Sequence, residues 1–181
     1  MAKATFITGN PNKAAFFKKY ADLEVDHHKL DLEEIQSVDL VEVVTHKAQQ
    51  AYEILKRPVF VEDVSLEIIS LGRIPGTFIK HFIDEIGLEN ICRLVDSFDD
   101  RSAIGKTAYG YCDENGVKVF EGSINGKIPE HPMGESGFGW DPIFVPEGYT
   151  QSRAQLNEAD YQNVYLQIKP IEKLAEFLKN H

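Results

Sequence analysis

The sequence predicts a single domain that mixes α-helices with β-strands. Apolar residues alternate between strand-type and helix-type spacing along the chain, a pattern typical of an α/β protein. The length of 181 residues suits one domain, and no repeat, linker or low-complexity segment interrupts it. With 43% hydrophobic residues, such a chain buries a substantial core without disulfides or a structural metal. We therefore predict one domain over residues 1–181.

Residues 4–8 and 23–28 predict the first two strands, with a helix between them. The first strand is apolar and ends at a Gly-Asn-Pro turn, whereas the second has alternating apolar residues. The intervening helix is expected to run from Asn12 to Tyr20, with Asn10 or Asn12 as its N-cap. Its apolar residues on one face are expected to be Ala15, Phe16 and Tyr20.

The rest of the chain predicts further helices and strands around a long hairpin. Asp39 is suited to cap a helix, and Asp113-Glu114-Asn115-Gly116 is suited to the turn of a hairpin. The expected elements are a helix at 39–55, strands at 58–61 and 66–71, short helices at 78–86 and 90–98, the hairpin at 103–128, a strand at 142–145 and a helix at 170–180.

Charge and composition exclude several classes of partner. The chain has 19 Lys and Arg against 29 Asp and Glu, a net charge of −10, whereas binding to nucleic-acid polymers or anionic membranes needs a basic surface. No apolar run is long enough to cross a membrane, and the first residues lack the apolar stretch of a signal peptide. Cys92 and Cys112 are isolated, so we expect reduced thiols and a cytoplasmic location.

The first candidate functional segment is Thr8-Gly9-Asn10, between the first strand and the first helix. A helix N-terminus presents unpaired backbone N–H groups and a partial positive charge, and Lys13 follows one turn later. These features suit a phosphate group, although an ordinary strand-to-helix turn has the same pattern.

The second candidate is the acidic pair Glu62-Asp63, which directly follows the apolar strand at 58–61. Carboxylates beside a buried strand are costly unless a cation neutralises them. Oxygen ligands of this kind suit Mg²⁺ bridging to substrate phosphates. The alternative is a solvated turn.

The third candidate is the glycine-rich stretch 134–142, which contains Phe138, Asp141 and Trp140, the one tryptophan of the sequence. Aromatic rings stack on nucleotide bases, and a carboxylate accepts hydrogen bonds from a base edge. The alternative is a loop that anchors its aromatic residues in the core. By contrast, Asp26-His27-His28 is interpreted as a polar strand edge, because neighbouring strand side chains point to opposite faces.

In order and spacing, these segments resemble the inosine triphosphate pyrophosphatase family, also called Ham1-like. The resemblance runs from Thr8 to about Tyr149 and continues weakly to the C-terminus. The matching motifs are Thr8-Gly9-Asn10 with Lys13, Val61-Glu62-Asp63, Leu71-Gly72 with Pro75-Gly76 and Ile79-Lys80, Phe98-Asp99-Asp100-Arg101-Ser102-Ala103, and Phe138-Gly139-Trp140-Asp141-Pro142.

The resemblance implies a fold, a reaction and an assembly. The implied fold is an elongated mixed β-sheet flanked by helices, which form two lobes with the active site in a central cleft. The implied reaction is hydrolysis of nucleoside triphosphates, such as ITP, dITP or XTP, to the monophosphate and pyrophosphate, in nucleotide-pool house-cleaning. Mg²⁺ is the expected cofactor, with Mn²⁺ as its substitute, and the expected assembly is a homodimer.

The resemblance also implies roles for residues of this sequence. Asp63 would activate the attacking water, with Lys13 as a second catalytic residue. The implied metal ligands are Glu34, Glu62 and Asp63. The implied phosphate-binding residues are Thr8, Gly9, Asn10, Lys13, Lys47 and Lys80. The implied base-binding residues are Phe138, Gly139, Trp140, Asp141, Tyr161 and Gln167. For Lys47 and Lys80 the alternative is a solvated surface lysine.

The C-terminal part departs from the family pattern. The family usually carries Lys-Asn-x-x-Ser-His-Arg there, and its basic residues contact the 6-oxo purine base. Here Tyr161, Leu166 and Gln167 replace the Lys, His and Arg. We therefore expect an altered or relaxed base preference.

Two alternatives to a purine nucleotide pyrophosphatase follow from this departure. One is a nucleotide-binding protein that keeps the fold and has lost turnover. The other is a related pyrophosphatase that acts on modified pyrimidines or another damaged nucleotide. Glu34, Glu62, Asp63, Lys13 and Lys80 argue against lost turnover, because a drifted site is expected to lose at least one of them.

Overall fold

The computed structural model describes residues 4–135 and 137–181, so Ser136 of the glycine-rich stretch lies outside the described residues. The helices are α1 (Pro11–Ala21), α2 (Leu40–Leu55), α3 (Ile79–Arg93), α4 (Glu158–Ile168) and α5 (Ile171–Asn180). The strands are β1 (Thr5–Ile7), β2 (Asp26–His28), β3 (Val59–Ile68), β4 (Pro75–Gly76), β5 (Ser102–Asp113), β6 (Gly116–Lys127) and β7 (Val145–Pro146). Short 3₁₀-helices are η1 (Ile69–Leu71), η2 (Asp141–Ile143) and η3 (Arg153–Gln155).

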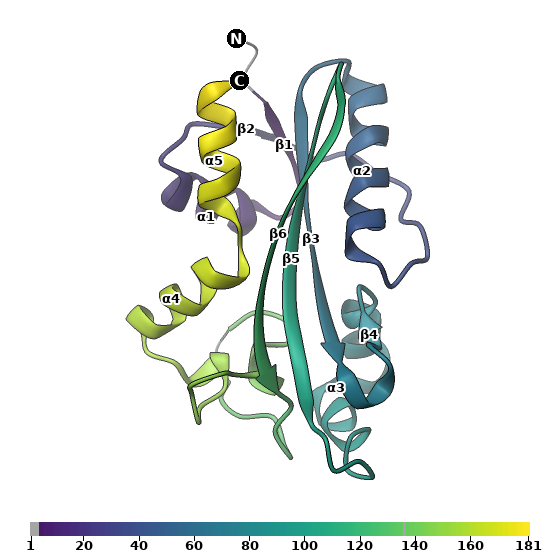
Figure 1. Cartoon of the computed structure of the whole chain (residues 1–181), viewed down its shortest axis with the longest axis vertical. Coiled ribbons are helices and arrows are strands. Elements are labelled where there is room, and N and C mark those ends of the chain that lie inside the picture. Colours follow the sequence, from purple (N-terminus) through teal and green to yellow (C-terminus); the bar gives the residue numbers. More distant parts are fainter. Residues whose placement is uncertain (1–3, 136) are drawn as a thin grey trace. The chain divides into compact units, whose positions relative to one another are not determined.

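The strands form a mixed sheet in the order β2-β1-β3-β5-β6-β7, with β4 paired to β3. β1 runs parallel to both of its neighbours, and Phe6 lies opposite His27 of β2 and Phe60 of β3. β4 is antiparallel to β3, and β7 is antiparallel to β6. The mixed sheet and its flanking helices confirm the predicted α/β class (Figure 1).

The chain divides into two compact units. Unit 1 comprises Met1–Asp63, Thr107–Glu121 and Pro170–His181, and unit 2 comprises Val64–Lys106 and Gly122–Lys169. The boundaries fall inside β3, β5 and β6, so each of these strands contributes residues to both units. The single domain over residues 1–181 stays a prediction.

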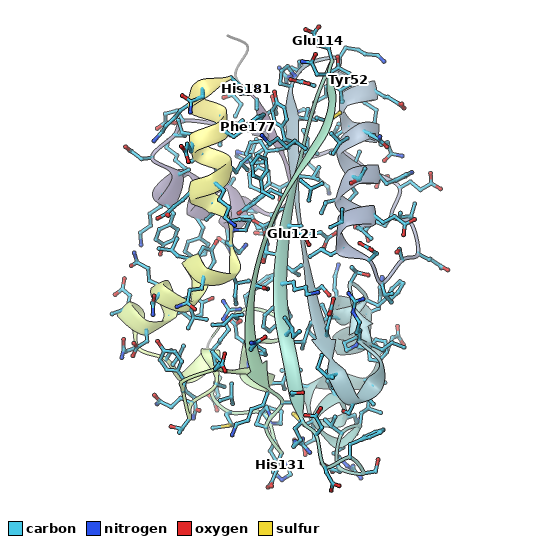
Figure 2. The ribbon with its side chains drawn as sticks, in the orientation of Figure 1. Tyr52, Glu114, Glu121, His131, Phe177 and His181 are labelled. Atoms are coloured by element: carbon cyan, nitrogen blue, oxygen red, sulfur yellow. The ribbon has the colours of Figure 1, made fainter. Side chains whose placement is uncertain are left out.

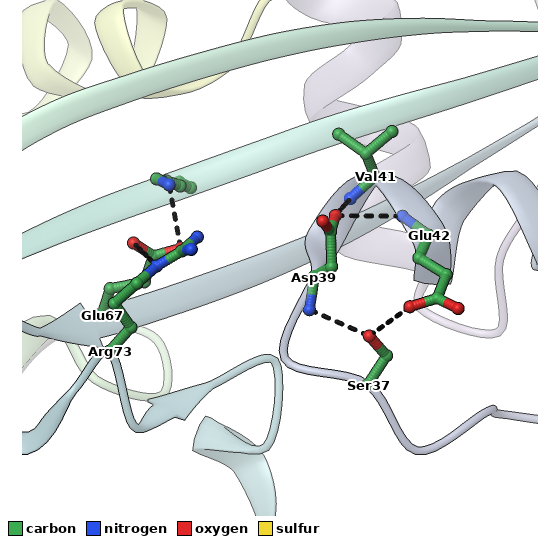
Figure 3. A network of polar contacts seen from close by, with 7 residues as sticks. Ser37, Asp39, Val41, Glu42, Glu67 and Arg73 are labelled. Atoms are coloured by element: carbon green, nitrogen blue, oxygen red, sulfur yellow. Dashed lines mark hydrogen bonds and ion pairs between the residues drawn. The ribbon is translucent and has the colours of Figure 1, made fainter.

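In unit 1, α2 packs on one face of the sheet. The helix begins where the sequence predicts, because the Asp39 carboxylate accepts hydrogen bonds from the N–H groups of Val41 and Glu42 (Figure 3). Its apolar side, including Val44, packs with residues of β1, β3 and β5. Gly110 permits this approach, because a Cβ there would lie 2.6 Å from the Val44 carbonyl oxygen.

The opposite face of unit 1 is aromatic and is covered by α1 and α5 (Figure 1). Phe6 of β1 stacks on Phe60 of β3 with ring centroids 4.6 Å apart, and Phe17 of α1 packs 4.9 Å from Phe60. Phe177 extends from α5 toward the hairpin and meets Tyr111 at 4.9 Å (Figure 2). Side chains alternate between the two faces of a strand. Ile7, Val59 and Val61 pack against α2, so the neighbouring residues Phe6 and Phe60 lie on the opposite, aromatic face.

Unit 2 has its own hydrophobic core. Its buried members come from β3, α3, the hairpin, the 138–146 segment and α4. Trp140 is 6% exposed and meets Phe144 edge-to-face at 5.2 Å. Gly105 makes room for the indole, because a Cβ there would lie 2.8 Å from the ring. Trp140 therefore anchors its loop to the core of unit 2.

Most of the predicted elements are confirmed, but the face of the first helix is wrong. α1 buries Ala14, Phe17 and Ala21, whereas Phe16 is 39% exposed. Adjacent phenylalanines let the apolar face be assigned in two helical phases. The aromatic cluster of β1 and β3 selects the phase that buries Phe17.

Three further expectations differ from the structure. The strands at 58–61 and 66–71 are one continuous strand, β3, which runs through Glu62-Asp63 and ends at Ile68. The strand at 142–145 is instead η2 followed by the two-residue β7. Helix α4 was not predicted from the sequence; its Asn157 cap accepts a hydrogen bond from the Asp160 N–H.

Candidate active site and the family of the chain

The segment between β1 and α1 has the geometry expected of an anion site. The Asn10 side chain accepts a hydrogen bond from the N–H of Asn12 at 3.0 Å, and the Asn10 N–H donates to Thr8 Oγ1 at 3.1 Å. The cap fixes the start of an 11-residue helix whose first turn contains no acidic residue. Lys13 follows one turn later, so a helix N-terminus and an ammonium group occur together in unit 1.

Glu62 and Asp63 point to opposite faces of β3, because successive strand side chains alternate. Glu62 lies on the α1 face, where its Oε1 is 3.2 Å from Lys13 Nζ and its side chain is 1% exposed. Asp63 lies on the α2 face, where its Oδ2 accepts a hydrogen bond from Lys47 Nζ at 2.6 Å. Each carboxylate of the pair is thus neutralised by a lysine from a different helix, which allows β3 to continue through both.

Lys47 joins two of the predicted site carboxylates. Its Nζ donates to Asp63 Oδ2 at 2.6 Å and to Glu34 Oε1 at 2.7 Å. Burial alone would lower the pKa of Lys47, but the charges and hydrogen bonds of Asp63 and Glu34 outweigh it and raise the pKa above 10.5. Lys47 is therefore a charged, partly buried cation rather than a solvated surface lysine.

The carboxylate oxygens of unit 1 are the type of ligand that a hard divalent cation such as Mg²⁺ prefers. Glu34 and Asp63 converge on the Lys47 ammonium, which shows that their oxygens share one position of cationic size. In residues 4–135 and 137–181, no three His, Cys, Asp or Glu side chains are grouped closely enough to hold a metal ion. A bound Mg²⁺ would thus combine Glu34 and Asp63 with substrate oxygens, whereas Glu62 faces the other side of β3. The full ligand set Glu34, Glu62 and Asp63 stays a prediction.

Apart from the 8–13 segment and Lys47, the residues predicted to bind phosphate or base lie in unit 2. Lys80 is an exposed residue in the first turn of α3. Gln167, on α4, is exposed and donates to Asn163 Oδ1 at 3.3 Å. The roles predicted for both residues stay predictions.

The 137–141 loop and Tyr161 come together in unit 2. Asp141 is 1% exposed, and its Oδ2 accepts hydrogen bonds from the Phe138 N–H at 2.8 Å and from the Tyr161 hydroxyl at 3.1 Å. Gly139, with φ +60°, lies between the exposed Phe138 and the buried Trp140. The loop therefore places its two aromatic residues in different environments: Trp140 is buried in the core, and Phe138 is exposed to solvent.

Sequence reasoning missed two buried ionic groups of unit 2. Arg153 is 7% exposed, and its Nη1 lies 2.9 Å from Asp141 Oδ1. Glu67 of β3 is 2% exposed and accepts hydrogen bonds from Arg73 and Lys106 (Figure 3). An acidic residue within the apolar run at 66–71 was the available signal for Glu67. Arg153 carries no comparable signal in the sequence.

Comparison with known proteins decides the family. The chain matches the Ham1 family over residues 4–177. The chain belongs to the Ham1 family. It is 38% identical to the inosine triphosphate pyrophosphatase of Yarrowia lipolytica, covering 96% of this chain and 94% of that protein. It is also 38% identical to the dITP/XTP pyrophosphatase of Methanopyrus kandleri, covering 99% and 97%.

A solved structure supports the same fold. A HAM1 protein from Coxiella burnetii superposes on this Ham1-family chain with a TM-score of 0.86, covering all of both chains at 22% identity. The predicted family and fold class are therefore confirmed. In the described residues, no helix has the length and hydrophobicity of a membrane-spanning segment.

Proposed function

We propose that this chain is a nucleoside triphosphate pyrophosphatase, which hydrolyses its substrate to the monophosphate and pyrophosphate. The carrying observation is the pairing of Lys13 with Glu62 and of Lys47 with Glu34 and Asp63 in unit 1. Two ammonium groups and three carboxylates are the groups that phosphate binding, charge neutralisation and water activation need. The names of the two relatives at 38% identity support the same reaction.

The proposed reaction breaks one phosphorus–oxygen bond. A water oxygen attacks the α-phosphorus, the bond to the oxygen that bridges the α- and β-phosphates breaks, and pyrophosphate leaves. Asp63 accepts the proton of the attacking water, a role that a partly exposed carboxylate can fill once a lysine no longer occupies it. When bound, Mg²⁺ would neutralise the phosphate oxygens, with Glu34 and Asp63, which meet at the Lys47 ammonium, as its protein ligands. Glu62 faces α1 on the other side of β3 and would act on the Lys13 side.

The lysines would change partners when the substrate binds. Lys13 and Lys47 neutralise carboxylates at 3.2 Å and 2.6–2.7 Å. A lysine carries a compact charge on a flexible side chain, so its ammonium group can move from a carboxylate to a phosphate oxygen and still form hydrogen bonds. The turn would expose the carboxylates at the moment when they are needed, and the Thr8-Gly9-Asn10 segment would hold a phosphate at the α1 N-terminus.

The proposed substrates are non-standard purine nucleotides such as ITP, dITP and XTP, with weaker discrimination against ATP than is usual in the family. Leu166 has no hydrogen-bond donor, and the Gln167 amide is neutral and bonded to Asn163. Neither supplies the charged donor that a 6-oxo group would favour. The ratio of kcat/KM for ITP over ATP should therefore be lower than in relatives that keep His and Arg at these positions.

The deciding experiment is pyrophosphate release from a panel of nucleoside and deoxynucleoside triphosphates, each with and without Mg²⁺. We expect release from ITP and XTP that depends on Mg²⁺, with Mn²⁺ as a partial substitute. Release from modified pyrimidines alone would replace the purine assignment. Absence of release from every nucleotide would refute the enzymatic function and favour a nucleotide-binding protein.

We also propose that the enzyme acts as a cytoplasmic homodimer. A reducing compartment is supported by Cys92 and Cys112, which are both buried and free of disulfides. Burial raises the pKa of the Cys92 thiol to about 12, so it stays protonated and inert at neutral pH. Sedimentation at micromolar concentration tests the assembly, since a dimer has twice the 20.5 kDa mass of the chain.

A further inference from the structure

Unit 2 buries an arginine in a place where hydrophobic packing alone gives no reason for one. Arg153 is 7% exposed, and the centre of its guanidinium lies 5.1 Å from the ring centroids of both Trp140 and Tyr161. Its Nη1 forms an ion pair with Asp141 at 2.9 Å. Its Nε is buried and has no hydrogen-bond partner among the described residues.

This arrangement is expensive for a purely structural role. A buried ion pair is often no more stabilising than apolar residues of the same volume, because both charges must be removed from water. A buried N–H without a partner adds to the cost. The arginine is therefore better explained by what it holds in place than by what it contributes to the free energy of unfolding.

What Arg153 holds is the Asp141 carboxylate, and Asp141 in turn holds the loop before it. With Oδ1 engaged by Arg153, Oδ2 accepts the N–H of Phe138 at 2.8 Å and the hydroxyl of Tyr161 at 3.1 Å. Gly137, at φ +103°, crosses so close to Asp141 that a Cβ there would lie 2.7 Å from Oδ2. The loop is thus wrapped around a fixed carboxylate.

The fixed loop presents one aromatic ring to solvent. Phe138 is 63% exposed, whereas Trp140 two residues later is buried. An exposed ring on a loop held by hydrogen bonds is a preorganised stacking surface, and base–aromatic stacking tolerates different bases. The chemistry therefore fits the base of a nucleotide.

We propose that Arg153 is a positioning residue for the substrate base. Through Asp141 and Tyr161 it fixes the loop that presents Phe138, and it acts on base binding rather than on the phosphate chemistry. The proposal rests on the proposed function, because it takes a nucleoside triphosphate as the ligand.

The test compares Arg153→Lys, Phe138→Ala and the double variant. We expect Arg153→Lys to raise the KM for ITP and its calorimetric Kd about 10-fold, with kcat within about two-fold, because the base loses its platform. Phe138→Ala should raise both constants at least as much. The double variant should match Phe138→Ala alone, since Arg153 acts through that ring.

Two controls separate positioning from a structural role. Arg101→Lys alters a second arginine of unit 2, which is partly buried and donates to the carbonyls of Cys92, Ile128 and Pro129; it should leave the Kd for ITP unchanged. Binding of inorganic tripolyphosphate, which has no base, should not respond to Arg153→Lys. If Arg153→Lys does not fold, Tyr161→Phe, which removes one hydroxyl from Asp141, should raise the Kd for ITP about two- to three-fold.

The outcomes distinguish this proposal from the proposed function. Additive effects of the two substitutions, or equal weakening of tripolyphosphate binding, would overturn the positioning role. Normal turnover together with an ITP affinity that Arg153→Lys does not change would also overturn the positioning role, while the enzyme assignment would stand. ITP binding that depends on Arg153 without any pyrophosphate release would instead support the positioning role and refute the proposed reaction. Failure to bind any nucleotide would overturn both.

Discussion

The buried and partly buried carboxylates of unit 1 and unit 2 are paired with different cations. In unit 1, Glu62 and Asp63 are neutralised by Lys13 and Lys47. In unit 2, Asp141 is neutralised by Arg153, and Glu67 is held by two guanidinium nitrogens of Arg73 as well as by Lys106. Both solutions satisfy the same electrostatic need.

The difference lies in how easily each pair can be exchanged. A lysine offers a compact charge on a flexible stem, whereas an arginine offers a planar fork that fixes two bonds in one geometry. In the proposed function, Lys13 and Lys47 of unit 1 turn toward a phosphate, whereas Arg153 of unit 2 holds the 137–141 loop in place through Asp141. The proposal therefore assigns exchange to the lysine pairs and positioning to Arg153.

The largest effect is expected in the lysine pairs of unit 1, from substitution of Asp63. Asp63→Asn keeps the shape of the side chain but cannot accept a proton, so kcat should fall by about 10²- to 10⁴-fold. Nucleotide binding should remain measurable by calorimetry. Asp26→Asn, on the exposed strand β2 of the same unit, is the matched control. Near-normal turnover by Asp63→Asn would remove the base role from this residue.

Making the unit 1 cation less exchangeable should have a smaller effect. Lys47→Arg retains the charge but can bind Glu34 and Asp63 with more than one N–H at once, so releasing them should cost about 1.4 kcal/mol more and lower kcat/KM about 10-fold. The melting temperature should not fall. Lys18→Arg, in an exposed pair with Glu24, serves as the control. Full activity in Lys47→Arg would show that partner exchange is not part of the cycle.

The smallest effect is expected in unit 2, where Glu67 should make the free energy of unfolding depend on pH. Burial alone would raise the pKa of Glu67, but hydrogen bonds from Arg73 and Lys106 outweigh it and lower the pKa below its ordinary 4.5. The charged carboxylate therefore stabilises the fold above pH 4.5, and this contribution is lost as the pH falls through the lower folded-state pKa.

Glu67→Gln should accordingly cost about 1 kcal/mol at neutral pH and progressively less in acid, as measured by urea unfolding at a series of pH values. Glu89→Gln, in an exposed pair with His131, should show no such convergence. A Glu67→Gln penalty that does not change with pH would contradict a role for the charge.

The sequence was sufficient for features that depend on local signals. Asp39 as an N-cap, the Asp113-Glu114-Asn115-Gly116 turn and the separation of two helices near Gly87 could all be predicted, because each depends on a few neighbouring residues. Gly87, with φ +76°, supplies the break inside α3. The acidic pair and the lysine at position 13 were likewise found from their places beside an apolar strand and at a helix start.

Other features depend on partners that are distant in the chain. The continuity of β3 through Glu62-Asp63 could not be predicted, because Lys13 and Lys47 approach from separate helices. The interpretation of Trp140 was left open between base stacking and core packing, and its burial against Phe144 becomes visible only in three dimensions. Arg153 was missed because no spacing in the sequence relates it to Asp141.

The alternation of β3 also bears on how this chain can evolve. Glu62 faces α1 and Asp63 faces α2 only while the number of residues from Val59 stays the same. Deletion or insertion of a single residue between Val59 and Glu62 would turn each carboxylate away from its lysine and toward the wrong helix.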